Sequence, residues 1–378
     1  MYSPKFTITN KILKEIGRVE ASKEIIENAP LVPAYEAKFR DEAIIRTVHH
    51  GTHIEGNELD TGEVKAVLAA GPEGLRPGGR GLGFEARDRD VQEVLNYRRV
   101  LNYIDRKPKR HLRGESSSHL GGGGGSQRFS EKDLLEIHRL TVDKILPADR
   151  SGKYRKTQVV VKNSKTGEVS FVPPRADEVP KLVKEFMDWI SSDNSSDIHP
   201  VLAAGITHYV LAFIHPFVDG NGRSARALAT MVLFSREYDI KKFFSIEEYF
   251  DRNAGKYYGT LQAVSNQKVE SLSDRDLTVW LEYFCEGLAE ELAKVRERVQ
   301  KLSLDLKLKG RTGQLVLSER QMKLVEYIES YGSVSNRQWR SLLPKFSDDT
   351  ILRDLKDLAK KGLIKKKGST KGAVYVLK

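Results

Sequence analysis

Twelve consecutive residues, 215–226, bring together the side chains that a phosphate-transfer reaction needs. The segment reads His-Pro-Phe-Val-Asp-Gly-Asn-Gly-Arg-Ser-Ala-Arg. Among these twelve residues, His215 is the one whose ordinary pKa suits a general base near neutral pH. Asp219 offers a hard oxygen ligand to Mg²⁺, which proteins usually hold through a carboxylate together with the phosphates of a substrate.

The same segment predicts a helix N-terminus that binds an anion. Pro216 continues a helix poorly, and Gly220 and Gly222 permit tight turns, so we expect a loop between two helices. The free N–H groups and the dipole of the second helix favour a bound anion. Arg223 and Arg226 lie on adjacent faces of its first turn and can bind phosphate oxygens as forks.

Residues 215–226 resemble the signature of the Fic family, His-Pro-Phe-x-Asp/Glu-Gly-Asn-Gly-Arg-x-x-Arg, and match it at every fixed position. Three further stretches resemble the family's core: 152–155 (Gly-Lys-Tyr-Arg), 171–174 (Phe-Val-Pro-Pro) and the Tyr257-Tyr258 helix. The resemblance implies a protein adenylyltransferase, which moves AMP from ATP to a Ser, Thr or Tyr hydroxyl of a protein target.

The resemblance also implies a role for each residue of the loop. His215 would deprotonate the target hydroxyl, and Asp219 would hold Mg²⁺ against the α- and β-phosphates of ATP. The backbone N–H groups that line the anion hole would come from Gly220, Asn221 and Gly222.

Two arginines and a tyrosine complete the site that the resemblance implies. Arg223 and Arg226 would bind the β- and γ-phosphates, and Arg223 favours AMP transfer, because relatives with lysine there transfer phosphate. Tyr258 is a candidate for packing against adenine, with a core-facing tyrosine as the alternative. A hairpin at 158–172 resembles the flap that binds the target segment by strand addition.

An upstream segment, 52–57 (Thr-His-Ile-Glu-Gly-Asn), resembles the family's inhibitory motif, Ser/Thr-x-x-x-Glu-Gly/Asn. In relatives this glutamate pairs with the second arginine and displaces the γ-phosphate, so the expected pair here is Glu55–Arg226. The match departs from the pattern at one position. Gly51 stands four residues before Glu55, and the nearest hydroxyl belongs to Thr52.

Apolar periodicity predicts a mainly α fold, with a helical Fic core, a β-hairpin flap and a C-terminal winged helix-turn-helix. Helices are expected within 33–69 and over 89–105, 129–145, 177–191, 199–214, 222–238, 248–265 and 275–303. We predict four regions: an N-terminal helical region with the inhibitory motif (1–105), a flexible linker (106–127), the catalytic core (128–305) and the winged helix (311–378).

The C-terminal region carries most of the positive charge. Residues 311–378 hold 15 Lys and Arg against 7 Asp and Glu, so they contribute +8 of the net +11. Thr350, Arg353 and Lys356 would lie on the recognition helix of the winged fold. This region would bind DNA through its phosphates, or dock a protein or a second copy of the chain.

The amino-acid composition limits the classes of protein and of site that remain possible. The 378 residues are 39% hydrophobic and 30% charged, with a single cysteine, Cys285, which excludes an internal disulfide and a cysteine-based zinc site. Apolar runs are too short for a membrane span, and the N-terminus lacks a signal sequence, so a cytoplasmic protein is expected. Two other functions stay open: an AMP-removing hydrolase in which Glu55 orients water, and a DNA-binding regulator with an inactive core.

Overall fold

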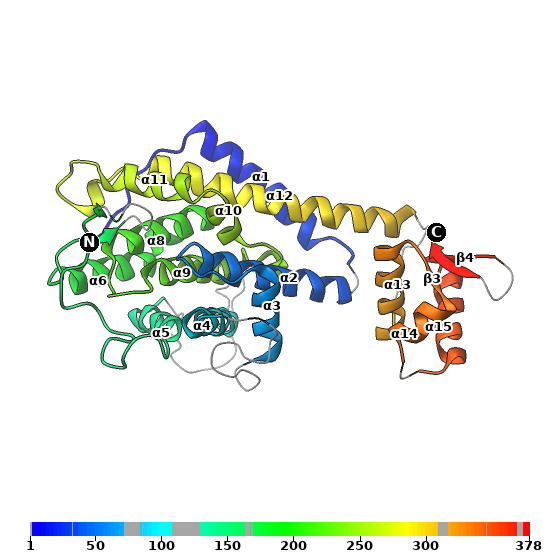
Figure 1. The fold of residues 1–378 in the computed structure, drawn as a ribbon. Helices are drawn as coiled ribbons and strands as arrows, with labels where there is room; N and C mark the ends of the chain where they lie inside the picture. Colours follow the sequence, from blue (N-terminus) through cyan, green and yellow to red (C-terminus); the bar gives the residue numbers. More distant parts are fainter. Residues whose placement is uncertain are drawn as a thin grey trace, which may run out of the picture. The chain divides into compact units, whose positions relative to one another are not determined.

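Most of the chain is α-helical, because apolar residues recur at helical spacing and β-like alternation of apolar and polar residues is scarce (Figure 1). The computed structural model describes residues 2–31, 33–71, 84, 86–107, 129–162, 167, 169–308, 317–344, 346–368 and 373–378. Within these residues the expected mainly α fold class is confirmed.

The chain divides into two compact units, Met1–Glu24 with Asp41–Val295, and Ile25–Arg40 with Arg296–Lys378. Residues of both expected regions, 1–105 and 128–305, therefore share the first unit. Before residue 309 the helices are α1 (Asn10–Glu27), α2 (Pro33–His53), α3 (Thr61–Ala70), α4 (Asp88–Asp105), α5 (Glu131–Thr141), α6 (Val179–Ile190), α7 (Asp193–Ser196), α8 (Pro200–Ile214), α9 (Asn221–Ser235), α10 (Ile246–Arg252), α11 (Ala254–Ser265) and α12 (Thr278–Leu308).

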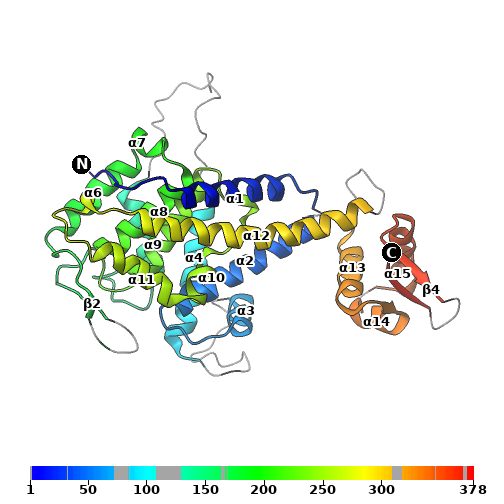
Figure 2. The ribbon, with the colours of Figure 1, turned by 90° about the horizontal axis from the view of Figure 1, so that it is seen from above.

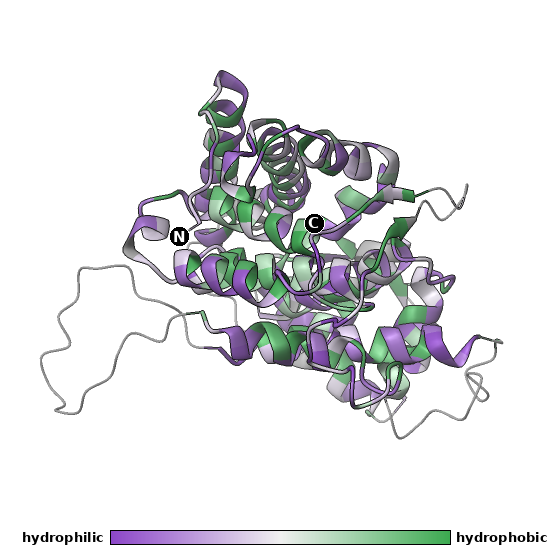
Figure 3. Ribbon diagram, turned by 90° about the vertical axis from the view of Figure 1, so that its left-hand side faces the viewer, coloured by the Kyte–Doolittle hydropathy of each residue, from purple (hydrophilic) through white to green (hydrophobic). Residues whose placement is uncertain are grey.

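Helix α8 forms the centre of the first unit. It is apolar on every side, and all its residues from Val201 to Leu211 are buried. Helix α9 packs alongside it (Figure 2). The surrounding helices carry both hydrophilic and hydrophobic residues, as expected of amphipathic helices that share a core (Figure 3). The loop 215–220 joins α8 to α9, so the buried core fixes both ends of the proposed site.

The expected helix at 248–265 is wrong in one respect, because it is divided at Asn253. This residue has φ −136° and ψ 60°, which are not helical, and its side chain accepts a hydrogen bond from Lys256 N. Asparagine favours this capping role over a helix interior. Helix α11 therefore begins at Ala254 as a separate element.

The expected hairpin is present, but its strands are short. Strand β1 (Val161–Lys162) pairs antiparallel with β2 (Val169–Phe171), and Val161 lies opposite Phe171. The residues 158–160, which were expected to belong to the first strand, lie outside it. Most of the turn, 163–166 and 168, falls outside the described residues.

Three helices and a small sheet form the C-terminal part of the second unit. The helices are α13 (Glu319–Tyr331), α14 (Asn336–Leu342) and α15 (Asp348–Lys360). The antiparallel sheet has the order β3-β5-β4, from β3 (Val334–Ser335), β4 (Ile364–Lys367) and β5 (Val374–Leu377). Ser318 and Ser347 cap α13 and α15, because their side chains accept hydrogen bonds from N–H groups of the first turn. The order of elements is consistent with a winged helix-turn-helix, which stays a prediction.

Several linker or glycine-rich segments lie outside the described residues. These are nearly all of the linker at 106–127, most of the glycine-rich stretch at 71–83 and the glycines near 310–313. Among the helices that are described, none combines the length and the apolar character that crossing a membrane requires.

Candidate active site

The loop between α8 and α9 is closed by a side chain. Oδ1 of Asn221 accepts a hydrogen bond from Phe217 N at 2.8 Å, and its Nδ2 donates to Phe217 O at 2.9 Å. Asn221 therefore holds the loop through its side chain, while its backbone belongs to the first turn of α9. The N–H groups of that turn have no partner within the helix, so they can bind an anion.

Arg155 fixes the other side of the loop. It is 2% exposed, and it donates from its backbone N to Pro216 O and from Nε to His215 O, both at 2.9 Å. Its Nη2 also donates to the carbonyl of Pro174, at the base of the hairpin. The sequence marked Arg155 as similar to the family core but gave it no role.

His138 supports the loop from α5, and the sequence gave no signal for this role. Its ring stacks on Phe217, with centroids 3.7 Å apart and planes at 3°. Nδ1 accepts from Gly152 N at 3.0 Å, so Nε2 must carry the proton that it donates to Asp219 O at 3.1 Å. Burial lowers the pKa of His138 to about 4, which keeps this tautomer neutral.

His215 has the protonation state that a general base requires. Its Nδ1 lies 3.2 Å from Ala212 O, and a carbonyl oxygen can only accept, so Nδ1 carries the proton. Nε2 is then the basic atom. Burial lowers the pKa of His215, against smaller opposing effects of Ala212 O and Glu55, so the ring is neutral at pH 7.

Glu55 lies against Arg226 in the place where an anion would bind. Nη2 of Arg226 is 2.8 Å from Oε1 of Glu55, and the arginine side chain is 1% exposed. A Cβ atom added to Gly222 would lie 2.1 Å from the same Oε1 atom, so a side chain there would displace the carboxylate. The carboxylate thus lies against the first turn of α9. Two other nitrogens of Arg226, Nη1 and Nε, are buried and form no hydrogen bond with any described residue.

The structure explains why Gly51 departs from the family pattern. A Cβ atom there would lie 2.5 Å from Cε1 of Tyr97, and the Gly51 carbonyl accepts a hydrogen bond from Arg226 Nη2 at 2.8 Å. The end of α2 keeps its local hydrogen bonds: Thr52 Oγ1 donates to Val48 O at 2.9 Å, and Glu55 N donates to Thr52 O at 3.0 Å. The missing hydroxyl therefore does not disturb the position of Glu55.

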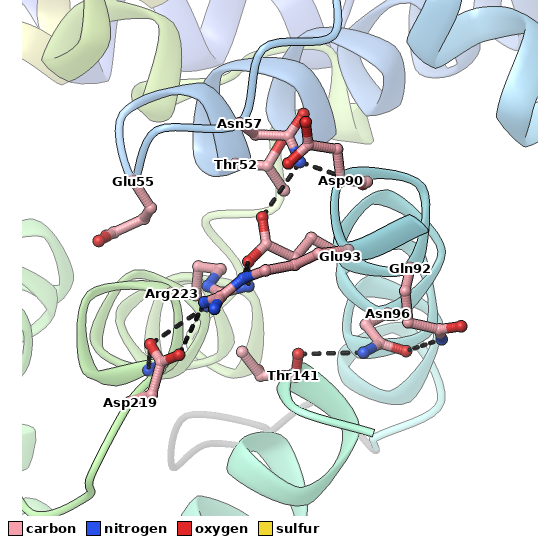
Figure 4. A network of polar contacts seen from close by, with 12 residues as sticks. Thr52, Glu55, Asn57, Asp90, Gln92, Glu93, Asn96, Thr141, Asp219 and Arg223 are labelled. Atoms are coloured by element: carbon pink, nitrogen blue, oxygen red, sulfur yellow. Dashed lines mark hydrogen bonds and ion pairs between the residues drawn. The ribbon is translucent and has the colours of Figure 1, made fainter. Parts of the chain in front are cut away.

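Asp219 and Arg223 belong to a network that extends to α4 (Figure 4). Oδ1 of Asp219 accepts from Gly220 N at 2.6 Å, and Oδ2 accepts from Arg89 Nη2 at 2.8 Å. Arg223 is ion-paired with Glu93 at 3.0 Å and with Asp219 at 3.5 Å. Burial alone would raise the pKa of Asp219, but Arg223, the Gly220 N–H and Arg89 together hold it below its ordinary value.

The donor chemistry at Asp219 fits Mg²⁺ that is held jointly with a nucleotide. The described residues contain no group of three or more His, Cys, Asp or Glu placed to hold a metal ion. The protein would supply one carboxylate, and phosphates and water would supply the other ligands, as is common for Mg²⁺. The side chain of Asp219 is 35% exposed and ionised at neutral pH, so it can act as a ligand for Mg²⁺.

Tyr258 contacts the segment that carries Glu55. Its hydroxyl donates to Ile54 O at 3.1 Å, and its side chain remains 45% exposed. The neighbouring Tyr257 is the buried member of the pair and hydrogen-bonds to His208 Nε2 at 3.0 Å. Packing of Tyr258 against adenine stays a prediction.

The hairpin presents apolar side chains to solvent. Val160, Val169 and Val172 are 44%, 53% and 59% exposed. Gln262 of α11 donates to Ser170 O at 3.0 Å and so ties β2 to the helical core. The hairpin is thus anchored to the helical core and has an apolar surface.

Comparison with known proteins agrees with this geometry. Residues 128–233 match the Fic/DOC family. Over 199 residues the chain is 29% identical to "Protein adenylyltransferase Fic" of Drosophila willistoni, covering 53% of this chain and 34% of that protein. The protein of the same name from Nematostella vectensis is 29% identical over 212 residues, which cover 56% of this chain and 42% of that protein. The chain thus spans less than half the length of these curated relatives.

Solved structures share the fold. A Fic family protein from Desulfovibrio desulfuricans G20 has a TM-score of 0.64 and 24% identity, covering 100% of this chain and 98% of that one. Fic-1 from C. elegans has a TM-score of 0.55 and 23% identity, covering 77% and 72%. The part of the chain that matches the family includes α5, the hairpin, α8 and residues 215–226. In sequence, residues 128–233 are therefore similar to the Fic/DOC family.

Proposed function

We propose that this chain is a protein adenylyltransferase, which transfers AMP from ATP to a Ser, Thr or Tyr hydroxyl of a protein. The observation that carries the proposal is the carboxylate of Glu55 lying between Arg226 and the first turn of α9. That place accepts an anionic oxygen, and the basic nitrogen of His215 belongs to the same loop. The names of the curated relatives support the same reaction.

His215 acts as the general base. Nε2 takes the proton of the target hydroxyl while that oxygen attacks the α-phosphorus of ATP. A new P–O bond forms, and the bond from the α-phosphorus to the oxygen that bridges to the β-phosphate breaks, so pyrophosphate leaves. The Nδ1 contact with Ala212 keeps Nε2 free for this step.

The first turn of α9 stabilises the charge that develops. Backbone N–H groups of Gly220, Asn221 and Gly222 are suited to phosphate oxygens, and Arg223 and Arg226 bind the β- and γ-phosphates. Asp219 would hold Mg²⁺, which neutralises charge on the α- and β-phosphates when bound. These groups are fixed before the reaction, because Arg155, His138 and Asn221 hold the loop.

Glu55 inhibits the resting enzyme. A guanidinium that is engaged by a carboxylate at 2.8 Å cannot also fork onto the γ-phosphate, and the carboxylate repels that phosphate. ATP would then bind with its α-phosphate turned away from the line of attack, and misplacement of this kind slows a positioned reaction.

Labelling with two forms of ATP tests the reaction. The Glu55→Gly variant is incubated with [α-³²P]ATP or [γ-³²P]ATP, and self-modification and labelled lysate proteins are separated on gels. AMP transfer gives label from the α-position only, and label from the γ-position would indicate phosphate transfer. Absence of both, combined with release of AMP from a pre-modified target by the wild-type chain, which keeps Glu55, would favour the hydrolase instead.

A further inference from the structure

Asn57 anchors the segment that carries Glu55 to helix α4. Its Nδ2 donates to the backbone oxygen of Asp90 at 3.0 Å and to Oε2 of Glu93 at 3.1 Å. The Asn57 side chain is buried, with 2% exposure. Asn57 follows Glu55 by two residues, so these two hydrogen bonds restrain the position of the Glu55 backbone.

The other oxygen of Glu93 faces the catalytic loop. Oε1 is 3.0 Å from Arg223 Nη1 and 3.1 Å from Arg89 Nε. Glu93 is 4% exposed and Arg223 is 2% exposed, so this ion pair is shielded from solvent. Figure 4 shows Glu93 between Asn57 on one side and Arg223 on the other.

We propose that Glu93 is a positioning residue with two connections. Through Oε1 it holds the guanidinium of Arg223 beside Asp219, and through Oε2 it binds Asn57 and so keeps Glu55 in place. This inference rests on the proposed function, and it adds a link between the inhibitory segment and the first of the two phosphate-binding arginines.

The two connections have separable consequences. If the Asn57 anchor fails, the hold on Glu55 is lost while Oε1 of Glu93 keeps its contact with Arg223, so AMP transfer rises and the effect requires Glu55. If the Glu93 carboxylate is removed, Arg223 also loses its buried counter-charge, and Asp219 at 3.5 Å is the remaining carboxylate near it. Arg223 then moves toward Asp219, and both are displaced from the positions that phosphate binding needs.

Arg87 provides a second, exposed way to loosen the same segment. Its Nη2 donates to Gly56 O at 3.0 Å, its Nε and Nη2 also donate to the Asp90 carboxylate at 2.8 and 3.0 Å, and its side chain is 54% exposed. Arg99, which lies within α4 and is 42% exposed, pairs with Asp143 instead and serves as the control. Asn57→Ala, Arg87→Ala, Arg99→Ala and Glu93→Gln are each made in the wild-type and Glu55→Gly chains.

The test measures kcat and KM for ATP in AMP transfer, and the affinity for a non-hydrolysable ATP analogue. Arg87→Ala and Asn57→Ala should raise kcat/KM by about 2- to 10-fold in the wild-type chain, the effect of one hydrogen bond. They should leave the Glu55→Gly chain unchanged. Glu93→Gln should raise KM and weaken analogue binding by about tenfold or more in the Glu55→Gly chain, and Glu93→Asp should restore part of both.

Two results would overturn the inference. Equal effects of Arg87→Ala and Asn57→Ala in both chains would show that the segment is not anchored this way. Unchanged KM and analogue affinity for Glu93→Gln in the Glu55→Gly chain would remove its role at Arg223. If the Glu55→Gly chain transfers no AMP at all, the proposed function fails, and analogue affinity in the same variants still decides the inference.

Discussion

Arg226 and Glu55 form an ion pair at 2.8 Å between residues 171 positions apart in the sequence, and the arginine is buried. The partner carboxylate is 29% exposed, so it can leave without opening the core. A bond between a fixed arginine and a more accessible glutamate is suited to regulation, because one partner stays in the site when the other departs.

Glu55→Gly should therefore raise AMP transfer, by about 10- to 100-fold if the lost contact contributes as charge-assisted hydrogen bonds usually do. Arg226→Ala also breaks the pair, but it should not activate, since the γ-phosphate contact is lost with it. Labelling of both variants and the wild type at saturating ATP measures the difference. Equal rates for Glu55→Gly and wild type would refute the inhibitory role.

The site shows what sequence can and cannot reveal. Residues 215–226 are contiguous, so their chemistry could be read directly, and the pairing of Glu55 with Arg226 followed from the resemblance. Arg89 and Glu93 gave no signal. They lie in a helix rich in charged residues, where such side chains usually face solvent, and only the packing of α4 brings them to Asp219 and Arg223.

The local sequence also predicts only some of the ends of helices and strands. Ser318 and Ser347 are helix caps of a kind that single residues predict, because a hydroxyl there satisfies free N–H groups. The same reasoning applies to Asn253, but the continuous apolar pattern around it suggested one helix. Strand β3 was missed, since its two residues are defined by pairing with β5 rather than by any pattern of their own.

The C-terminal region gives a prediction about salt. Lys365, Lys366 and Lys367 of β4 are all exposed. If they contact DNA phosphates, replacing all three with Ala should reduce the slope of log affinity against log salt by about two to three. A triple variant at exposed lysines of the first unit, Lys14, Lys132 and Lys181, is the control. Absent or salt-independent binding in the unchanged chain would favour the docking or dimer-forming role.

His138 should make folding sensitive to acid. Its pKa is about 4 in the folded chain and near 6.5 when exposed, so the fold favours the neutral ring. This contribution is fully present above pH 6.5 and is lost as the pH falls toward 4, about 3 kcal/mol in all. Urea unfolding across this range should show the loss in wild type and a smaller loss in His138→Ala. Lys132→Ala, on the same helix, should behave like wild type.

His215→Ala should reduce AMP transfer by about 10²- to 10⁴-fold, the usual contribution of a general base. Binding of a non-hydrolysable ATP analogue should change little, because the phosphate contacts come from Asp219, the arginines and the first turn of α9. Single-turnover labelling and equilibrium binding separate the two effects. Transfer at the wild-type rate would mean that another group accepts the proton.

The pH dependence of transfer gives an independent test of the same residue. A base works only when deprotonated, and burial lowers the pKa of His215, so kcat/KM should stay constant through pH 7 and fall only below 6.5. The carboxylate of Glu55 opposes this shift, because a negative charge favours the protonated ring. In Glu55→Gly the acidic limb should therefore move to still lower pH, while the rate at neutral pH rises. An acidic limb that stays in place when Glu55 is removed would show that the titrating group is not close to that carboxylate, and would count against His215 as the base.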